Sequence, residues 1–506
     1  MDGRVEPAHD GIGLSFPLSV TLSPDDFRRA WDHIHPMPPT IHPDGLPTPL
    51  RYWAIVTVAL GIIMAVMDSA IANVALPTIA FDLHASPALS IWIVNGYQLA
   101  ITISLLPLAA LGDIVGYRRV YLAGLILFTI ASLLCALAHT LPLLAAARVV
   151  QGFGAAGIMS VNSALIRFIF PHKMLGRGLS LNTTIVAISA AIGPTIAGGI
   201  LAVAPWPWLF AVNVPFGIAA FIVGIRALPH TPRALHRFDI LGALFTATMF
   251  GLLISSIDAL GHGAGTGLFA AQFVAAIVIG YLLVRREHLA VSPMLPVDLM
   301  RIPLFALSIG TSICSFAGQM LALVSLPFLL QGALHFTAVQ TGLLMTPWPI
   351  AIALISPVAG RLADRYPAGL LGAIGLLVFG AGLLALALIP PHASIVDIVW
   401  RMLLAGVGFG LFQSPNNRAM LTSAPRSRAG GASGMLGTAR LLGQTIGAAL
   451  VALAFARAPQ AGTSIALYIG VGFAVLAAAV SSLRLFDRTG QSLPERAPAT
   501  DSREAH

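Results

Sequence analysis

The chain is built from long apolar runs separated by short polar connections, and the runs exceed the length of ordinary strands. A helix needs about 20 mostly apolar residues to cross the hydrocarbon core of a bilayer. Fourteen runs meet this requirement, the eighth only narrowly because a glycine-rich stretch precedes it. We predict membrane-spanning helices at residues 53–76, 88–110, 119–138, 142–166, 179–203, 208–228, 239–260, 268–284, 303–331, 339–360, 369–389, 394–416, 431–455 and 464–483.

The composition agrees with an all-α integral membrane protein. Of the 506 residues, 57% are apolar and only 9% are charged, against about 25% charged in soluble domains. Such sparse charge excludes a soluble enzyme or a nucleic-acid binder. Cys135 and Cys314 lie inside apolar runs, where they form neither a disulfide framework nor a metal cluster. The first run begins at residue 53, too late for a signal peptide.

The basic residues fix the expected orientation, because cytoplasmic loops are enriched in Lys and Arg. With a cytoplasmic N-terminus, 24 of the 28 Lys and Arg residues fall in inward-facing loops and tails. Outward loops keep only Arg457, and Arg148, Arg401 and Arg440 fall within spans. An odd error in the number of helices would scramble this asymmetry. We therefore expect both termini in the cytoplasm.

The chain contains an internal repeat. Asp113 and Asp364 each follow a span within a basic loop and lie 251 residues apart, and Arg148 and Arg401 lie 253 apart. The offset corresponds to eight helices, as expected for two six-helix bundles with two helices inserted between them. The predicted parts are a disordered cytoplasmic tail at 1–50, an N-terminal bundle at 51–230, an inserted hairpin and linker at 231–300, a C-terminal bundle at 301–485 and a cytoplasmic tail at 486–506.

Five motifs occur in order at the expected helices. They are DSAIANVALPTI at 68–79, LGDIVGYRR at 111–119, RVVQGFG at 148–154, GPTIAGG at 193–199 and WPWLFAVNVPFG at 206–217. Together they resemble the 14-helix drug:proton antiporter branch of the major facilitator superfamily. Two positions depart from the usual pattern, Ala109 at the opening of the loop motif and Pro207 between the tryptophans.

Two opposite charges lie at similar depth in the first half. Asp68 is 15 residues past Trp53, about 22 Å along its helix, and Arg148 is seven residues past Leu141, about 10 Å from the opposite entry. Ionisable side chains inside a membrane are functional by default. We interpret Asp68 as the group that exchanges a proton, with Arg148 tuning it. The alternative is a permanent structural ion pair.

The resemblance implies two gating elements. One is a cytoplasmic latch between the halves, for which ordinary helix capping is the alternative. Its candidate residues are Asp113, Arg118, Arg119, Asp364 and Arg365. The other is a bend in the fifth helix that disfavours proton leak, for which plain helix packing is the alternative. Its residues are Gly193, Pro194, Gly198 and Gly199.

A substrate cavity should be apolar with a few polar groups. Candidate lining residues are Tyr97, Gln98, Asn162, Phe316, Gln319, Trp348 and Gln413. Aromatic faces attract lipophilic cations, so these are the expected substrates, together with protons. The spans lack clustered carboxylates or histidines, so we expect no metal and no cofactor. GxGxxG at 152–157 lies inside a span, where small residues serve helix packing and not nucleotide binding.

The sequence therefore predicts proton-coupled efflux of lipophilic, cationic drugs across a bacterial inner membrane by a monomer. Two alternatives stay open. One is export of a single natural metabolite, and the other is a membrane sensor that uses the same fold without transport. A membrane enzyme is disfavoured, because no nucleophile–base pair lies within the spans.

Overall fold

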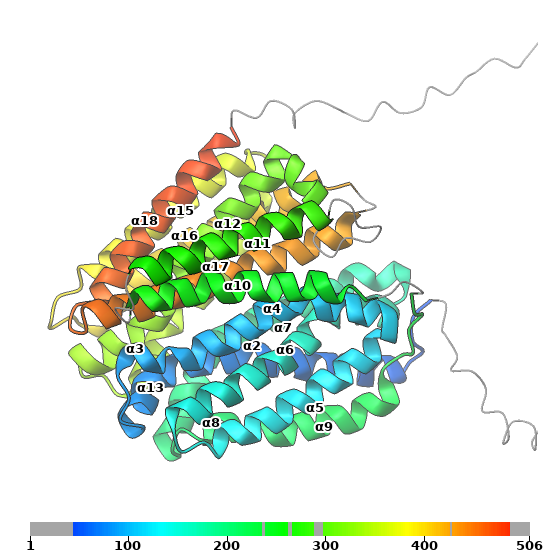
Figure 1. Cartoon of the computed structure of the whole chain (residues 1–506), viewed down its shortest axis with the longest axis horizontal. Coiled ribbons are helices and arrows are strands. Elements are labelled where there is room, and N and C mark those ends of the chain that lie inside the picture. The colour runs from blue at the N-terminus through cyan, green and yellow to red at the C-terminus, as the bar shows by residue number, and fades with distance from the viewer. Residues whose placement is uncertain (1–43, 235–237, 262–265, 288–296, 426–427, 486–506) are drawn as a thin grey trace, which may run out of the picture. The chain divides into compact units, whose positions relative to one another are not determined.

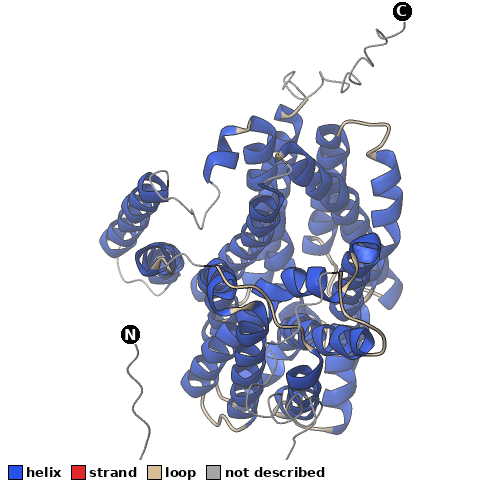
Figure 2. Ribbon diagram, turned by 90° about the vertical axis from the view of Figure 1, so that its right-hand side faces the viewer, coloured by secondary structure: helices blue, strands red, loops and turns tan. Residues whose placement is uncertain are grey.

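The computed structural model describes residues 44–234, 238–261, 266–287, 297–425 and 428–485. Within these ranges the secondary structure is helical throughout, with no strand (Figure 2). Fourteen of the helical segments are long and apolar enough to cross a membrane, which confirms the predicted number. Most of the predicted tails, residues 1–43 and 486–506, lie outside the described residues.

The first six spans form one helical half (Figure 1). The second and sixth spans each begin with a short helix of four residues. The helices of this N-terminal half are α2 (Leu50–Asp82), α3 (Pro87–Ser90), α4 (Trp92–Val115), α5 (Tyr117–Ala136), α6 (Leu141–Ile169), α7 (Leu175–Val203), α8 (Trp208–Ala211) and α9 (Asn213–Ala227).

Two inserted helices and a second half follow. The inserted hairpin consists of α10 (Ile240–Gly261) and α11 (Thr266–Glu287). The helices of the C-terminal half are α12 (Pro303–Phe328), α13 (Ala338–Met345), α14 (Pro347–Leu362), α15 (Ala368–Ala387), α16 (Ile395–Ser423), α17 (Ala429–Arg457) and α18 (Gly462–Leu483). A π-helical turn, η3 (Leu329–Ala333), extends α12, and α13 with α14 makes one span.

The two halves repeat the same packing. In the first half α5 and α4 pack on α6, and α7 and α9 pack on α2. In the second half α15 and α14 pack on α16, and α17 and α18 pack on α12. Each pair is the counterpart of the other after an offset of eight spans. The packing therefore confirms two six-helix bundles with two helices between them.

Glycines allow the closest helix crossings in both halves. A Cβ on Gly154 of α6 would collide with the backbone of Phe128 in α5. A Cβ on Gly408 of α16 would collide in the same way with the backbone of Phe379 in α15. Small residues at such positions let helix backbones approach within a membrane. These crossings also align the two halves residue by residue.

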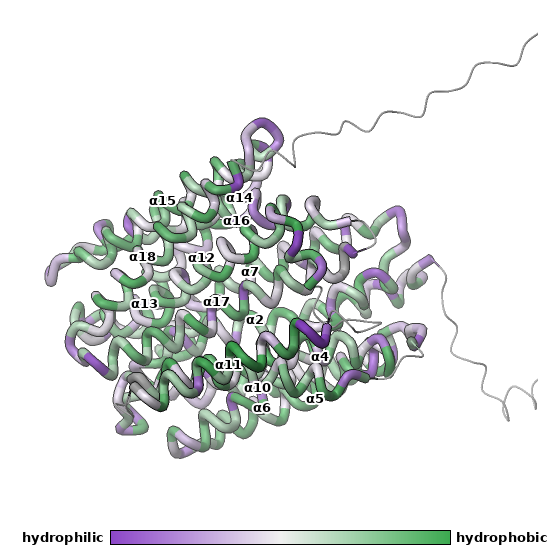
Figure 3. Tube along the Cα trace, turned by 45° about the horizontal axis from the view of Figure 1, so that its top comes forward, coloured by the Kyte–Doolittle hydropathy of each residue, from purple (hydrophilic) through white to green (hydrophobic). Residues whose placement is uncertain are grey.

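Polar residues gather at the helix ends, and apolar residues cover the lengths of the spans (Figure 3). We call the end of the bundle where α2 begins and α18 ends the terminal end, and the opposite one the far end. Of the predicted N-terminal tail, residues 44–49 are described at the terminal end. There Leu46 is buried and donates its backbone N–H to the Ile169 carbonyl at 3.1 Å.

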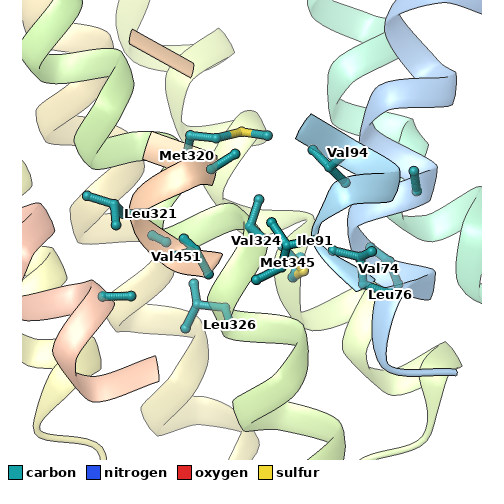
Figure 4. Close-up of a cluster of buried hydrophobic side chains, with 14 of the residues drawn as sticks. Val74, Leu76, Ile91, Val94, Met320, Leu321, Val324, Leu326, Met345 and Val451 are labelled. Atoms are coloured by element: carbon teal, nitrogen blue, oxygen red, sulfur yellow. The ribbon is translucent and has the colours of Figure 1, made fainter. Parts of the chain in front are cut away.

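The two halves meet in an apolar cluster at the far end. Val74 of α2 and Ile91, beside α4, belong to the same buried cluster as Val324 of α12 and Met345 of α13 (Figure 4). Hydrogen bonds support this contact, because the Gln331 side chain donates to the Val74 carbonyl at 2.9 Å. The far end is therefore closed between the halves.

Candidate functional site

Asp68 lies in the interior of the N-terminal half with 1% of its surface exposed. Its carboxylate accepts three hydrogen bonds from three different side chains. Arg148 Nη1 donates to Oδ2, while Gln151 Nε2 and Asn213 Nδ2 donate to Oδ1 at 3.1 and 2.9 Å. The donors come from α6 and α9, both of which face α2. The structure thus surrounds one buried carboxylate with donors only.

Arg148 is fully buried and is held by more than its ion pair with Asp68. Its Nε donates to the Ile93 carbonyl at 3.0 Å, and Nη1 also donates to Gln151 Oε1 at 2.5 Å. The guanidinium lies over the Tyr97 ring, with Cζ 4.1 Å from the ring centroid. These contacts fix the position of the charge next to Asp68, although its Nη2 has no partner among the described residues.

Gln151 connects the pair to a further ring of polar groups. Its Nε2 donates to Ser132 Oγ of α5 at 2.8 Å, and the Cys135 thiol donates to its Oε1 at 3.6 Å. Tyr97 donates its hydroxyl to the Ala65 carbonyl of α2 at 2.8 Å. The ion pair is therefore part of a network that joins α2, α4, α5, α6 and α9.

Every side chain that hydrogen-bonds to the Asp68 carboxylate does so as a donor, and one of them is the Arg148 cation. A proton on Asp68 would place a new donor against existing donors and would remove the charge that balances Arg148. Protonation would weaken the hydrogen bonds that join α2 to α6 and α9.

Two members of this network, Gln151 and Asn213, were not among the candidates predicted from the sequence. Both are uncharged, so charge within a span did not single them out. The available signal was spacing: Gln151 lies one helical turn after Arg148 on the same face, and Asn213 stands at the start of α9, inside the sixth-helix motif.

The repeat predicted from Arg148 and Arg401 needs a correction. Gly152 of α6 packs against the Tyr97 carbonyl and Ala100 of α4. Gly406 of α16 packs in the same way against the Trp348 carbonyl and Ala351 of α14.

The register between α6 and α16 is therefore 254 residues, so Met402 is the counterpart of Arg148. Because one residue turns a helix by about 100°, Arg401 faces another way. It pairs with Asp397 at 3.0 Å and lies beside Trp400.

The candidate latch residues of the first half bind the segment that leads to the hairpin. Asp113 accepts a hydrogen bond from the Tyr117 hydroxyl at 2.5 Å, and its carbonyl accepts one from Ala234 N–H at 2.8 Å. Arg118 contacts the Ile225 carbonyl and His230. Partial desolvation and then the nearby arginines lower the pKa of His230, so its neutral ring can accept from Arg118.

In the second half Asp364 forms an ion pair with Arg418 of α16. Arg119 and Arg365 are exposed. Asp113 thus bonds within its own half and to the segment that connects that half to the hairpin, and Asp364 bonds within the second half. The structure does not bring these two aspartates together.

The glycine–proline motif of α7 lies against the C-terminal half at the far end. Gly198 approaches Val339 of α13, where a Cβ would lie 2.9 Å from its Cα, and the Pro194 carbonyl approaches Gly342. Gly193 instead faces Ala70 of α2, and Gly199 faces open space. A hydroxyl–hydroxyl hydrogen bond of 2.6 Å joins Thr195 to Thr346 beside these contacts.

The candidate substrate residues do not form one group. Tyr97 belongs to the Arg148 network, and Asn162 donates to Asn182 at 2.7 Å. Phe316 and Trp348 are buried in the C-terminal half, where each packs against another ring.

Gln98 and two other candidates lie elsewhere. Gln98 donates to Gln444 of α17 at 3.0 Å and so lies where the halves meet. Gln319 is 8% exposed on α12, and Gln413 is half-buried on α16.

The family model of the Major Facilitator Superfamily matches residues 58–448 and 307–500. The fold agrees with solved structures of other transporters. The inward open conformation of the xylose transporter XylE from E. coli gives a TM-score of 0.61 at 15% identity, covering 88% of this chain and 98% of XylE. The POT family transporter PepTSo gives 0.66 at 15% identity, covering 88% and 99%. The chain belongs to the major facilitator superfamily and is a multi-pass membrane transporter.

Three relatives with higher sequence identity are also transport or export proteins. The chain is 56% identical over 449 residues to the uncharacterized transporter YebQ of Escherichia coli K12, covering 88% of this chain and 98% of YebQ. It is 31% identical to the tetracenomycin C resistance and export protein of Streptomyces glaucescens, covering 80% and 76%. It is 29% identical to the riboflavin transporter RibZ of Clostridioides difficile, covering 80% and 89%.

Proposed function

We propose that this transporter exports lipophilic small molecules from the cytoplasm of a bacterium in exchange for protons, and that Asp68 carries the proton. Arg148, Gln151 and Asn213 hold the carboxylate when it is charged. The observation that carries the proposal is the burial of Asp68 in an all-donor network between α2, α6 and α9. Resistance and export proteins among the relatives support efflux as the direction.

We place the terminal end of the bundle in the cytoplasm, because the arginine-rich loops lie there. In this orientation the closed far end, with Thr195–Thr346 and the α7–α13 contact, faces outward. Transporters of repeated halves alternate access by rocking one half against the other. A proton that arrives at Asp68 from the outside would loosen the α2–α6 contact, and its release to the inside would restore it.

The sequence-based expectation of lipophilic, cationic drugs as substrates is part of this proposal, with aromatic rings as its support. The test is dye efflux in everted membrane vesicles, with and without an imposed pH gradient. The native chain is compared with Asp68→Asn, and Asp397→Asn serves as a matched control, because Asp397 pairs with Arg401 near a helix end.

We expect gradient-driven efflux by the native chain and the control, and its loss in Asp68→Asn at normal expression. If Asp68→Asn keeps full pH dependence, Asp68 is structural and another group carries the proton. If the native chain moves a single metabolite and no dye, export is specific to that metabolite. If it moves nothing under any gradient, a sensor on this fold replaces the proposal.

A further inference from the structure

Arg440 is an arginine inside a membrane span that the Asp68 network does not use. It lies nine residues past Gly431, where the thirteenth span begins, which is about 13 Å along the helix axis. Its side chain is half-buried, and its Nε is buried without a hydrogen-bond partner. Among the described residues no hydrogen bond or ion pair is formed by its guanidinium.

Its neighbours on α17 show which surroundings the side chain enters. One turn further on, Gln444 accepts a hydrogen bond from Gln98 of α4, and Gly443 packs against the Ile313 carbonyl and Phe316 of α12. One turn earlier, Gly437 contacts Leu105 of α4. Residues three and four apart lie on one helix face.

Arg440 therefore lies on α17 between the helix face that contacts α4 and the helix face that contacts α12. These helices belong to different halves. The residue thus faces the region where the halves meet, at a depth well below the lipid headgroups. An arginine at this depth without a counter-charge is unfavourable unless a partner arrives.

Two carboxylates in the described spans are already paired elsewhere. Asp68 is already occupied by three donors in the N-terminal half. Asp397 is paired with Arg401 in the first turn of α16, at the far end. Gln444 adds donors beside Arg440, because its side-chain oxygen is engaged by Gln98 and its N–H groups remain.

We propose that Arg440, assisted by Gln444, binds an anionic oxygen-bearing group, a carboxylate or sulfonate, on the transported compound. This inference rests on the proposed export function and specifies its substrate class. A planar guanidinium donates two parallel hydrogen bonds to a carboxylate. The substrate would then be a lipophilic compound that carries an anionic group, alone or beside a cationic one, with apolar and aromatic contacts supplied by α12.

The test measures equilibrium binding, so it does not depend on proton coupling. The full chain is placed in phosphatidylcholine nanodiscs at neutral pH, and binding of rhodamine B and of its ethyl ester is followed by fluorescence anisotropy. These dyes share the cationic ring system and differ only in a free carboxylate. The variants are Arg440→Gln and Arg440→Lys, with Arg401→Gln as the control for loss of an arginine from a span.

We expect the native chain to bind the acid about tenfold more tightly than the ester, equivalent to about 1.4 kcal/mol. Arg440→Gln should bind the two dyes alike, and Arg401→Gln should match the native chain. Arg440→Lys should keep only part of the preference, because the charge remains while the two parallel hydrogen bonds are lost. Gel filtration and the thermal midpoint check that each variant is folded.

Three results overturn the assignment. The first is that the native chain fails to bind the acid or binds the ester as tightly. The second is that Arg440→Gln keeps the native preference. The third is that phosphatidylglycerol in the nanodiscs displaces the acid, which would assign Arg440 to a lipid headgroup. None of these results bears on the proton role of Asp68, since no gradient is applied. Conversely, if the native chain shows no gradient-driven efflux in the vesicle experiment, that result contradicts the proposed export function and leaves the binding result for Arg440 unchanged.

Discussion

The two halves share one helix packing but differ in chemistry at the same position. Gly193 of α7 faces Met67 and Ala70 of α2, and Gly447 of α17 faces Ala317 and Met320 of α12. This alignment makes Gly318 the counterpart of Asp68. In the first half the position holds a buried carboxylate with three donors. In the second half a Cβ on Gly318 would lie 3.2 Å from the carbonyl oxygen of Gly470 in α18.

The same replacement extends to the partners of Asp68. Met402 stands where Arg148 stands, and Ala405, one residue before Gly406, corresponds to Gln151. Aromatic rings fill the neighbouring space: Phe409 packs against Phe316 and Phe379 with ring centroids 5.3 and 5.4 Å apart. Such edge-on ring pairs contribute to packing without any charge.

This contrast teaches that the bundle does not require an ion pair at its centre. The C-terminal half forms the same helix crossings with glycine, methionine and aromatic side chains. Replacing a buried ion pair by apolar groups is often neutral or stabilising. This contrast supports the proposal that the polar network of the first half serves transport and not the stability of the bundle.

Breaking the network on one side gives the largest expected effect. Arg148→Ala leaves Asp68 as an uncompensated buried charge, so we expect a loss of about 3–5 kcal/mol in the free energy of unfolding. Arg401→Ala in the second half removes a partly exposed pair and should cost about 1 kcal/mol or less. Thermal unfolding of both variants in the same detergent measures the difference. Equal destabilisation would mean that the halves do not differ in this respect.

Making the first half resemble the second separates stability from coupling. The double variant Asp68→Asn with Arg148→Met removes both charges, and the side-chain amide that replaces the carboxylate can still accept from Gln151 and Asn213. We expect unfolding within about 2 kcal/mol of the native chain, because no unpaired charge remains. Gradient-driven efflux should be absent. A double variant as unstable as Arg148→Ala alone would contradict this explanation.

The shared crossings should respond alike in both halves. Gly154→Ala and Gly408→Ala each force a Cβ onto the backbone of a neighbouring helix, so each should cost about 1–3 kcal/mol. Gly472→Ala has open space around it and serves as the control. It should be neutral or gain up to about 1 kcal/mol from helix propensity. Thermal midpoints of the variants measure these effects. A clear difference between the two glycine variants would weaken the structural equivalence of the α5–α6 and α15–α16 crossings.

The smallest effect concerns the inserted hairpin. Hydrogen bonding to Arg286, at 2.6 Å, lowers the pKa of Asp239. A lowered carboxyl pKa stabilises the fold above the unfolded value of about 4, and this contribution is lost as the pH falls through the folded value. We expect Asp239→Asn to lower the free energy of unfolding at pH 7 by less than about 1 kcal/mol. The difference from the native chain should shrink as the pH falls below about 4, and thermal unfolding over this pH range measures it. A difference that stays constant over this range would exclude titration of this pair.

The spans were predictable because the bilayer imposes a length and a polarity on each helix. The predicted eighth span, 268–284, lies within the observed Gly267–Glu287. The residue-by-residue alignment of the second half with the first was not predictable. The offset between the halves is 251 residues for α4 and α14 but 254 residues for α6 and α16. A change of a few residues in connecting segments leaves no hydropathy signal, yet it moves Arg401 to another helix face.

The functional site was predictable only through its charges. Asp68 and Arg148 stand out because charge within a membrane is unfavourable. Gln151 and Asn213 complete the network without charge, and polar amides also occur elsewhere in the spans, as at Gln98 and Gln319. Whether the two halves touch at the far end or at the terminal end depends on the balance between two arrangements of the whole bundle. Composition carries no information on that balance.

The inserted hairpin has a consequence for the route by which a lipophilic compound enters. α10 packs against α4 and α17, one helix from each half, and most of α11 lies at the surface of the protein. The hairpin therefore covers the seam at which α4 and α17 contact each other. On the α7–α14 side the main contacts of the described helices include no such cover. Under the proposed export function, we expect a lipophilic compound in the bilayer to approach the interior on the α7–α14 side and not on the side that the hairpin covers.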